Sequence, residues 1–269
     1  MSRAIVITSG KGGVGKTTTT ANLGMALARL GHPVVVIDAD FGLRNLDLLL
    51  GLENRVVYTA LDVLAGQCRL DQALVKDKRQ PKLALLPAAQ NRTKESINAN
   101  QMRQLVKALS RRYKYILIDC PAGIEMGFRN AIAPATEAII VTTPEISAVR
   151  DGDRIVGLLE AHGIKRINLI INRIRPAMVK ANDMMSVDDV KEILAIPLIG
   201  TVPDDEQVIV STNRGEPLVL SEQESWAGTA FNNIARRLDG ETVPFIDLDN
   251  LNPGFLARLR NRLFGQKRG

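Results

Sequence analysis

The sequence predicts an α/β fold, with a mostly parallel, twisted sheet and helices on both of its faces. Three observations predict it: short apolar runs recur along the chain, most of them are continuous rather than alternating, and segments of helical length separate them. Continuous apolar runs are typical of strands buried on both faces, and alternation with helices implies parallel strands joined by right-handed crossovers. We therefore expect the loops that follow the strands to meet at one edge of the sheet, where ligands bind in such folds.

Seven segments are expected to form strands, and each is rich in Ile, Val, Leu or Ala. In chain order they cover residues 4–9, 33–38, 83–88, 115–119, 138–143, 167–172 and 197–202. After the first strand, residues 17–31 are amphipathic and end in a glycine suited to a helix C-cap. The pattern fades near residue 238, and residues 239–254 are acidic, contain two prolines and lack periodicity. We therefore predict one domain over residues 1–238, a linker over 239–254 and a separate segment over 255–269.

The composition and charge of the chain limit the classes of function that the protein can have. Of the 269 residues, 45% are hydrophobic, which is enough for a full core. Cys68 and Cys120 lie far apart and form no metal-type spacing, as expected for a protein of the reduced cytosol. No apolar stretch approaches the ~20 residues that cross a bilayer. Five of the six net positive charges lie in residues 255–269, so the rest of the chain is nearly neutral. This argues against a nucleic-acid-binding surface there.

The motif "GKGGVGKT" (residues 10–17) lies between the first predicted strand and the first predicted helix. This is the context that a phosphate-binding loop requires. Its glycines let backbone N–H groups approach phosphate oxygens, and the helix N-terminus adds partial positive charge. Lys16 is expected to reach the β- and γ-phosphates, and the Thr17 hydroxyl to bind Mg²⁺. The motif predicts a three-layer P-loop nucleoside triphosphatase.

Three aspartates follow predicted strands that should end at the same edge. Asp119 ends "YILID", where a carboxylate would hold Mg²⁺ through water, and "VVVIDAD" ends in Asp38 and Asp40, one of which would orient the attacking water. Any one of these aspartates alone is also explained as a helix N-cap or turn residue. Three at strand ends on one edge favour a catalytic site.

The early lysine, Lys11, makes the loop more specific, because "KGGVGKT" resembles the deviant Walker A motif of the MinD/ParA family of P-loop ATPases. In that family the early lysine crosses a dimer interface to the partner's nucleotide. The resemblance implies an ATP hydrolase that needs Mg²⁺ and is activated by dimerisation. Lys11, Lys16 and Asp40 would be catalytic, and Thr17 and Asp119 would hold the metal. Asp151 would lie at the dimer interface beside the partner's Lys11.

Longer blocks are similar to the MinD group of this family, which selects the division site. They are "VIDADFGLRNLDLLLGLENRVVYTALDV" (36–63), "IDCPAGIE" (118–125), "TTPEISAVRDGDRI" (142–155) and "NRGEPLVL" (213–220). By this resemblance Asn172 reads the adenine amino edge, and residues 202–205 clasp the base from the other side. The implied ATP-binding residues are Lys11, Gly12, Gly13, Val14, Gly15, Lys16, Thr17, Thr18, Asn172, Pro203 and Asp204.

The basic C-terminal segment has the pattern of an amphipathic helix. On a helical wheel its apolar side chains fall within one arc of about 100°, flanked by arginines, which is the pattern of a helix lying in a membrane surface. A helix docked on the body and a solvated tail are the alternatives. The resemblance to the MinD group implies membrane targeting. The expected membrane contacts are Phe255, Leu256, Arg258, Leu259, Arg262, Leu263 and Phe264.

These features favour a dimerising ATPase that binds the inner membrane surface in its ATP state, recruits septum-placement regulators and is released after hydrolysis. Its partners would be a second copy, MinC, MinE-like regulators and anionic lipids, and it would divide between the cytoplasm and the cytoplasmic face of the inner membrane. A ParA-like DNA-partition ATPase is an alternative that explains the basic charge, and a MinD-like regulator of flagellar number is another. The concentration of the basic residues in an amphipathic segment favours the membrane.

Overall fold

The computed structural model describes residues 2–40, 44–89, 97–223 and 225–250. The predicted membrane segment 255–269, with every membrane contact named above, and the last linker residues, 251–254, lie outside the described residues. Within the described part of the chain, no helix has the length and apolarity that a bilayer crossing needs.

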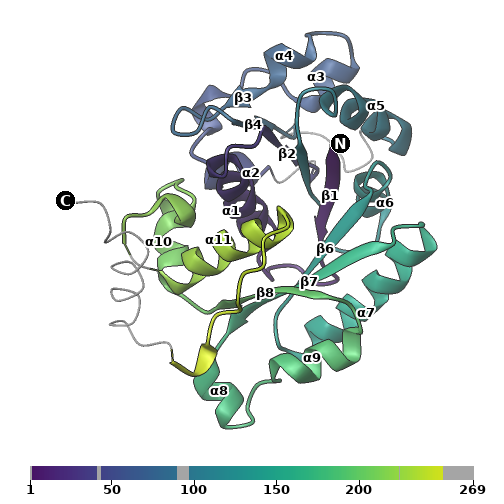
Figure 1. Ribbon diagram of the computed structural model, residues 1–269. Helices are drawn as coiled ribbons and strands as arrows, with labels where there is room; N and C mark the ends of the chain where they lie inside the picture. Colours follow the sequence, from purple (N-terminus) through teal and green to yellow (C-terminus); the bar gives the residue numbers. More distant parts are fainter. Residues whose placement is uncertain (1, 41–43, 90–96, 224, 251–269) are drawn as a thin grey trace, which may run out of the picture.

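The described strands form one sheet of eight in the order β3-β4-β2-β5-β1-β6-β7-β8 (Figure 1). They are β1 (Arg3–Thr8), β2 (Val34–Asp38), β3 (Val75–Lys76), β4 (Leu83–Leu86), β5 (Tyr115–Asp119), β6 (Glu137–Thr142), β7 (Arg166–Ile174) and β8 (Leu198–Pro203). Every pairing is parallel except that of β3 with β4. The predicted mostly parallel α/β fold is confirmed, and the first strand in the sequence lies near the middle of the sheet.

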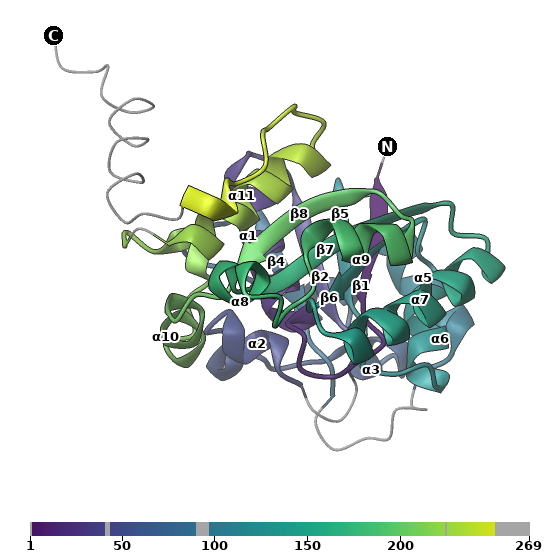
Figure 2. The same cartoon turned by 90° about the horizontal axis from the view of Figure 1, so that it is seen from below.

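Helices cover both faces of this sheet. Their bounds are α1 (Lys16–Arg29), α2 (Leu46–Leu49), α3 (Ala60–Leu64), α4 (Leu70–Ala73), α5 (Ala99–Leu109), α6 (Met126–Ile132), α7 (Ile146–Ala161), α8 (Pro176–Lys180), α9 (Val187–Leu194), α10 (Gln207–Asn213) and α11 (Trp226–Leu238), with short 3₁₀ turns at Glu53–Arg55, Leu218–Leu220 and Leu248–Asn250. Figure 2 shows α1 and α11 on one side of the strands and α5, α6 and α7 on the other. The chain therefore has the three layers that the sequence predicts.

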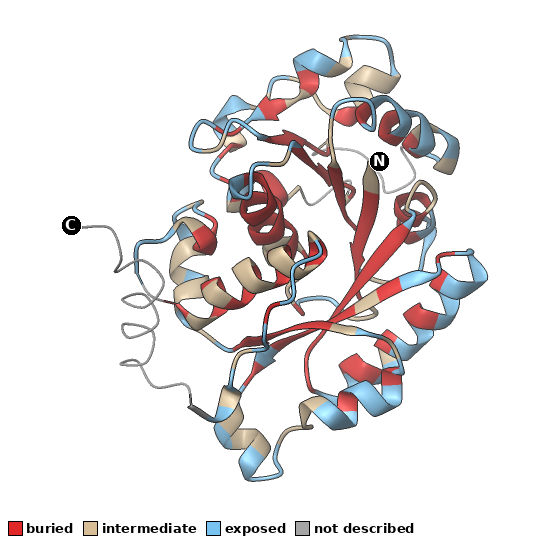
Figure 3. Ribbon diagram, in the orientation of Figure 1, coloured by how far each residue is buried: buried red, intermediate tan, exposed pale blue. Residues whose placement is uncertain are grey.

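The continuous apolar runs are buried on both faces, as predicted (Figure 3). One core cluster joins the sheet to α1 and α11, a second joins the opposite face to α5, α6 and α7, and a smaller third lies between β7, α7 and α9. Burial of each Ile, Leu or Val side chain contributes about 1.5–3 kcal/mol to folding. The core thus fixes the strand ends, and these carry the polar residues of the site.

The pairing register of the strands brings the predicted site residues to one edge of the sheet. The loop after β1 lies between the ends of β5 and β6, because β1 pairs with both strands. Asp38 at the end of β2 pairs in register with Asp119 at the end of β5. Crossover topology thus gathers residues from distant parts of the sequence beside residues 10–17.

Candidate nucleotide-binding site

The loop between β1 and α1 has a backbone that only glycine tolerates at several positions. Gly13 and Gly15 have φ angles of 77° and 101°, in the left-handed region that other residues rarely adopt. A Cβ atom on Gly10 would lie 2.3 Å from the Asp151 carbonyl oxygen of α7, and one on Gly15 would lie 2.3 Å from Asn172 Nδ2. Such a loop presents its N–H groups without side chains in the way, as a phosphate cradle requires.

Lys16 opens α1 and lies over this loop. The residue is 8% exposed, and its Nζ donates to the Ser9 hydroxyl at 3.0 Å. Ser9 in turn donates to the Lys11 carbonyl at 2.7 Å. Ser9 therefore holds the ammonium group above the loop backbone, where a phosphate oxygen would accept from it.

Asp119 and Thr17 lie together beside Lys16, as the predicted metal pair requires. The Asp119 carboxylate accepts from Thr17 and, at 3.2 Å, from the Thr20 hydroxyl. Burial raises the pKa of Asp119 to about 6, although these hydrogen bonds and the Lys16 charge act in the opposite direction. A hydroxyl and a carboxylate are the oxygen donors that Mg²⁺ takes beside a nucleotide, so the pair fits this ion.

The two aspartates after β2 have different environments. Asp38 is fully buried, and its carboxylate accepts from the backbone N–H groups of Asp40 and Leu46 at 3.0 and 3.2 Å. Burial and the nearby Asp119 raise the pKa of Asp38 to about 8. Asp40 is half-buried beyond the strand end, and its charge reaches both Asp38 and Asp119. Asp38 therefore shapes the loop after β2, and the water-positioning role of Asp40 stays a prediction.

Cys120, directly after Asp119, is buried. Burial is the main cause that raises the pKa of its thiol to about 12. The thiol is therefore protonated at neutral pH and serves packing rather than nucleophilic chemistry.

The side chain of Lys11 reaches the start of α7. Its Nζ lies 3.1 Å from Glu145 Oε2 and 3.0 Å from the Ser147 hydroxyl. Both charged side chains are about half exposed, at 42% and 55%. The hydrogen bond from Lys11 is the main cause that lowers the pKa of Glu145. Exposed pairs of this kind contribute about 0–1 kcal/mol, so Lys11 leaves this position at little cost.

The predicted base-side residues come from the ends of β7 and β8. Asn172 is buried, donates to the Val14 carbonyl at 2.8 Å and accepts from the Arg173 N–H. A register irregularity between Ile171 and Ile174 turns its side chain towards the loop. Pro203 pairs with Ile174 across this irregularity, and the next residue, Asp204, donates its N–H to the Ile174 carbonyl and binds Arg175 at 2.6 Å through its carboxylate.

The structure thus brings the phosphate loop and the residues predicted to bind metal and base to one edge of the sheet. Asp151 lies there too, with its backbone against Gly10. Sequence reasoning missed Ser9, Thr20, Glu145 and Ser147, which position the charged groups. Thr20 could have been predicted from the sequence, because it lies one helical turn after Lys16. Glu145 and Ser147 carry no such signal, since their role depends on how α7 approaches the loop.

Comparisons with known proteins agree with this geometry. Residues 5–218 match the family model described as the CobQ/CobB/MinD/ParA nucleotide binding domain. A putative septum site-determining protein MinD of Guillardia theta is 69% identical over 98% of both chains. A chain of the MinC:MinD cell division protein complex of Aquifex aeolicus is 50% identical, with a TM-score of 0.85 over 91% of this chain and 99% of that one. The Pyrococcus horikoshii septum site-determining protein MinD, complexed with Mg-ADP, is 33% identical, with a TM-score of 0.81 over 89% and 97%.

Proposed function

Because the chain belongs to the CobQ/CobB/MinD/ParA nucleotide-binding family, within its MinD group of septum site-determining ATPases, we propose that it is an ATP-driven membrane switch. ATP joins two copies, the pair binds the inner membrane surface through its two C-terminal segments, and hydrolysis releases it. On the membrane it recruits a MinC-like inhibitor, as the complex of its Aquifex relative suggests, and a MinE-like protein stimulates release.

The observation that best supports this proposal is that Lys11 and Lys16 differ in their burial and in their contacts. Lys16 is buried over its own loop, whereas Lys11 is half exposed and binds two exposed residues at the start of α7, Glu145 and Ser147. A cation whose present contacts cost little free energy to break can move to a nucleotide in a facing subunit. Supplied to developing phosphate charge, it acts like an arginine finger, a device worth ~10³–10⁵ in rate in GTPases.

The residues of this chain divide the hydrolytic work. The loop N–H groups and Lys16 bind and orient the phosphates, Asn172 and residues 202–205 hold the base, and Asp40 positions the attacking water. Thr17 and Asp119 would hold Mg²⁺, which neutralises charge on the β- and γ-phosphates. Lys11 of the partner subunit then completes the site only in the dimer, so hydrolysis depends on assembly.

The membrane step depends on weak binding by each tail. A buried Leu or Phe contributes up to ~1.5–3 kcal/mol, and each Arg on anionic lipid about 1 kcal/mol. Ordering the segment costs about 1–2 kcal/mol per residue, so the opposing contributions are similar in size. Two tails on one dimer gain ~10²–10⁴ in avidity. The ATP dimer therefore binds the membrane, and a monomer released after hydrolysis leaves it.

Co-sedimentation with vesicles of phosphatidylcholine and phosphatidylglycerol tests the proposal. The full chain should sediment with ATP and much less with ADP, and a chain ending at residue 254 should stay in solution with either nucleotide. Equal sedimentation in all three cases would refute the membrane switch. ATP-dependent DNA binding that survives the truncation would instead favour a partition ATPase.

A further inference from the structure

Residues 239–250, here called the strap, run from the end of α11 past β8 to α8 (Figure 1). The sequence predicts a linker here, yet contacts to the body hold the strap at its start, middle and end. We infer that the strap is a fixed part of the body, which carries the start of the C-terminal segment to α8 and leaves a short tether. The inference rests on the proposed membrane function of that segment.

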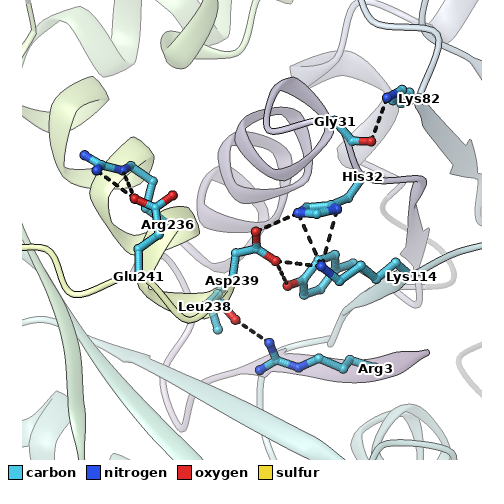
Figure 4. Close-up of polar contacts among 10 residues, drawn as sticks. Arg3, Gly31, His32, Lys82, Lys114, Arg236, Leu238, Asp239 and Glu241 are labelled. Carbon is cyan, nitrogen blue, oxygen red and sulfur yellow. Dashed lines mark hydrogen bonds and ion pairs between the residues drawn. The ribbon is translucent and has the colours of Figure 1, made fainter. Parts of the chain in front are cut away.

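The start of the strap is bound by a cluster of polar side chains at Asp239 (Figure 4). Its Oδ1 accepts from Lys114 Nζ at 2.7 Å and from the Tyr115 hydroxyl at 2.8 Å, and its Oδ2 lies 2.7 Å from His32 Nε2. Arg3 binds the carbonyl of the preceding residue, Leu238. These partners lie at the beginnings of β1, β2 and β5, so the strap starts at the edge of the sheet opposite the phosphate loop.

The middle of the strap is tied down by Arg237 of α11. This guanidinium donates to the Val243 and Pro244 carbonyls at 2.9 and 2.7 Å and to the Ile199 carbonyl of β8 at 2.9 Å. It also lies 4.2 Å from the centroid of the Phe245 ring, a cation–π distance. One side chain therefore joins α11, β8 and the strap.

Apolar contacts hold the end of the strap. Ile246 packs against the cluster of α1 and α11, and Leu248 against the cluster of β7 and α9. Asp249 pairs with Lys180 of α8 at 3.1 Å, although both side chains are mostly exposed and the pair contributes little. The strap therefore ends beside α8, at the same edge of the sheet as the nucleotide site.

This path shortens the tether. The predicted linker has sixteen residues, twelve belong to the strap, and only residues 251–254 remain to connect it to the amphipathic segment. The effective concentration of a second tail falls roughly as the −3/2 power of tether length. A tether of sixteen residues instead of four would lower it about eightfold. The strap thus raises the avidity of a dimer without touching lipid.

Two variants separate tether length from other effects. Arg237→Ala with Ile246→Ser and Leu248→Ser, here called the serine variant, removes the guanidinium contacts at the middle of the strap and the apolar contacts at its end, so that the tether grows to residues 240–254. A twelve-residue Gly/Ser insertion after Asn250 lengthens the tether and leaves the strap intact. Ile193→Ser, a half-exposed residue on the outer face of α9, is the matched control. Each protein is sedimented with phosphatidylcholine–phosphatidylglycerol vesicles in ATP and in ADP, and digested with a glutamate-specific protease that cleaves after Glu241.

The insertion variant should need about eightfold more lipid for half-maximal binding in ATP, and the serine variant about sevenfold more. Their weak binding in ADP and the binding of the control should be unchanged. Only the serine variant should be cleaved faster at Glu241, because it alone loses the Arg237 contacts to the residues that follow this site. Wild-type binding by both variants, or a loss confined to the serine variant, would overturn the inference. So would cleavage of the wild type as fast as the serine variant. If the wild type bound vesicles equally in ATP and in ADP, the proposed function would be refuted. The rate of cleavage at Glu241 would still show whether the strap is fixed to the body.

Discussion

Lys11 and Lys16 belong to one loop, but their burial gives them different tasks. Lys16 is enclosed by the loop, and the Ser9 hydroxyl accepts from it, so its charge is fixed before any phosphate arrives. Lys11 is half exposed, and its partners Glu145 and Ser147 compete with water. Preorganised charge favours binding, whereas a releasable charge favours contact with a second molecule.

Replacing Lys11 with Ala should separate hydrolysis from binding. We expect dimer-dependent turnover to fall by ~10³-fold or more, because a cation is lost at the developing phosphate charge. Nucleotide affinity should persist, since Lys16 and the loop are intact. The measurements are turnover at saturating ATP and equilibrium binding of a fluorescent ATP analogue. Lys16→Ala should lose binding itself, and a Lys11→Ala protein that turns over like the wild type would contradict the assignment.

Asp239 gives stability a pH dependence at the other edge of the sheet. Partial burial acts to raise its pKa, but hydrogen bonds from Lys114, His32 and Tyr115 outweigh it and lower the pKa well below the usual range. The carboxylate therefore stabilises the fold above the unfolded-state pKa of about 4, and this contribution is lost as the pH falls below that value.

Asp239→Asn should accordingly lower the unfolding free energy by about 1.5–3 kcal/mol at pH 7, the usual contribution of hydrogen bonds to a charged group. The difference from the wild type should shrink below about pH 4. Urea unfolding of both proteins at pH 7, 4 and 3.5 measures it. Equal stability at pH 7, or a difference that persists unchanged into acid, would show that the carboxylate does not act through its charge.

At the scale of elements, the contact between the phosphate loop and α7 holds the nucleotide edge together. Gly10 lies against the backbone of Asp151, so neither partner has a flexible atom that could move aside. The same helix begins with the residues that hold Lys11. The loop and α7 are therefore expected to move as one unit.

Gly10→Ala tests this contact. The added methyl would lie 2.3 Å from a backbone oxygen, so α7 must shift, and we expect the unfolding free energy to fall by about 1–3 kcal/mol and nucleotide affinity to fall with it. Gly157→Ala on the same helix is the control, because no atom lies within 4 Å of the added methyl. Removing a helix-interior glycine should stabilise by about 0.5–1 kcal/mol. Equal effects of the two variants would contradict the argument.

The sequence predicted the elements that local pattern determines. All seven expected strands are present, because their continuous apolar runs are unmistakable, and Gly31 follows α1 with a φ of 97° as a C-cap glycine does. The two-residue β3 was missed, since it is too short to show a pattern, and β7 extends beyond residue 172 through an irregularity that no spacing reveals. Lys16, Thr17 and Asp119 were found by motif, whereas Glu145 and Ser147 depend on tertiary packing.

At the scale of the whole molecule, the sheet separates two regions with different roles. The ends of β1, β2, β5, β7 and β8 carry the residues of the candidate nucleotide site, and the beginnings of β1, β2 and β5 hold the start of the strap. The strap then returns the chain to the nucleotide edge beside α8. In the proposed cycle, the edge that senses ATP is therefore also the edge from which the membrane segment departs.

The central place of β1 also affects how the protein is made. Its residues 3–8 are synthesised long before both neighbouring strands, β5 and β6, and β6 ends only at Thr142. At about 5–20 residues per second, the wait is on the order of ten seconds. The phosphate loop thus takes its shape only after residue 142 has been synthesised, so a nascent subunit should not bind nucleotide before β5 and β6 have joined β1.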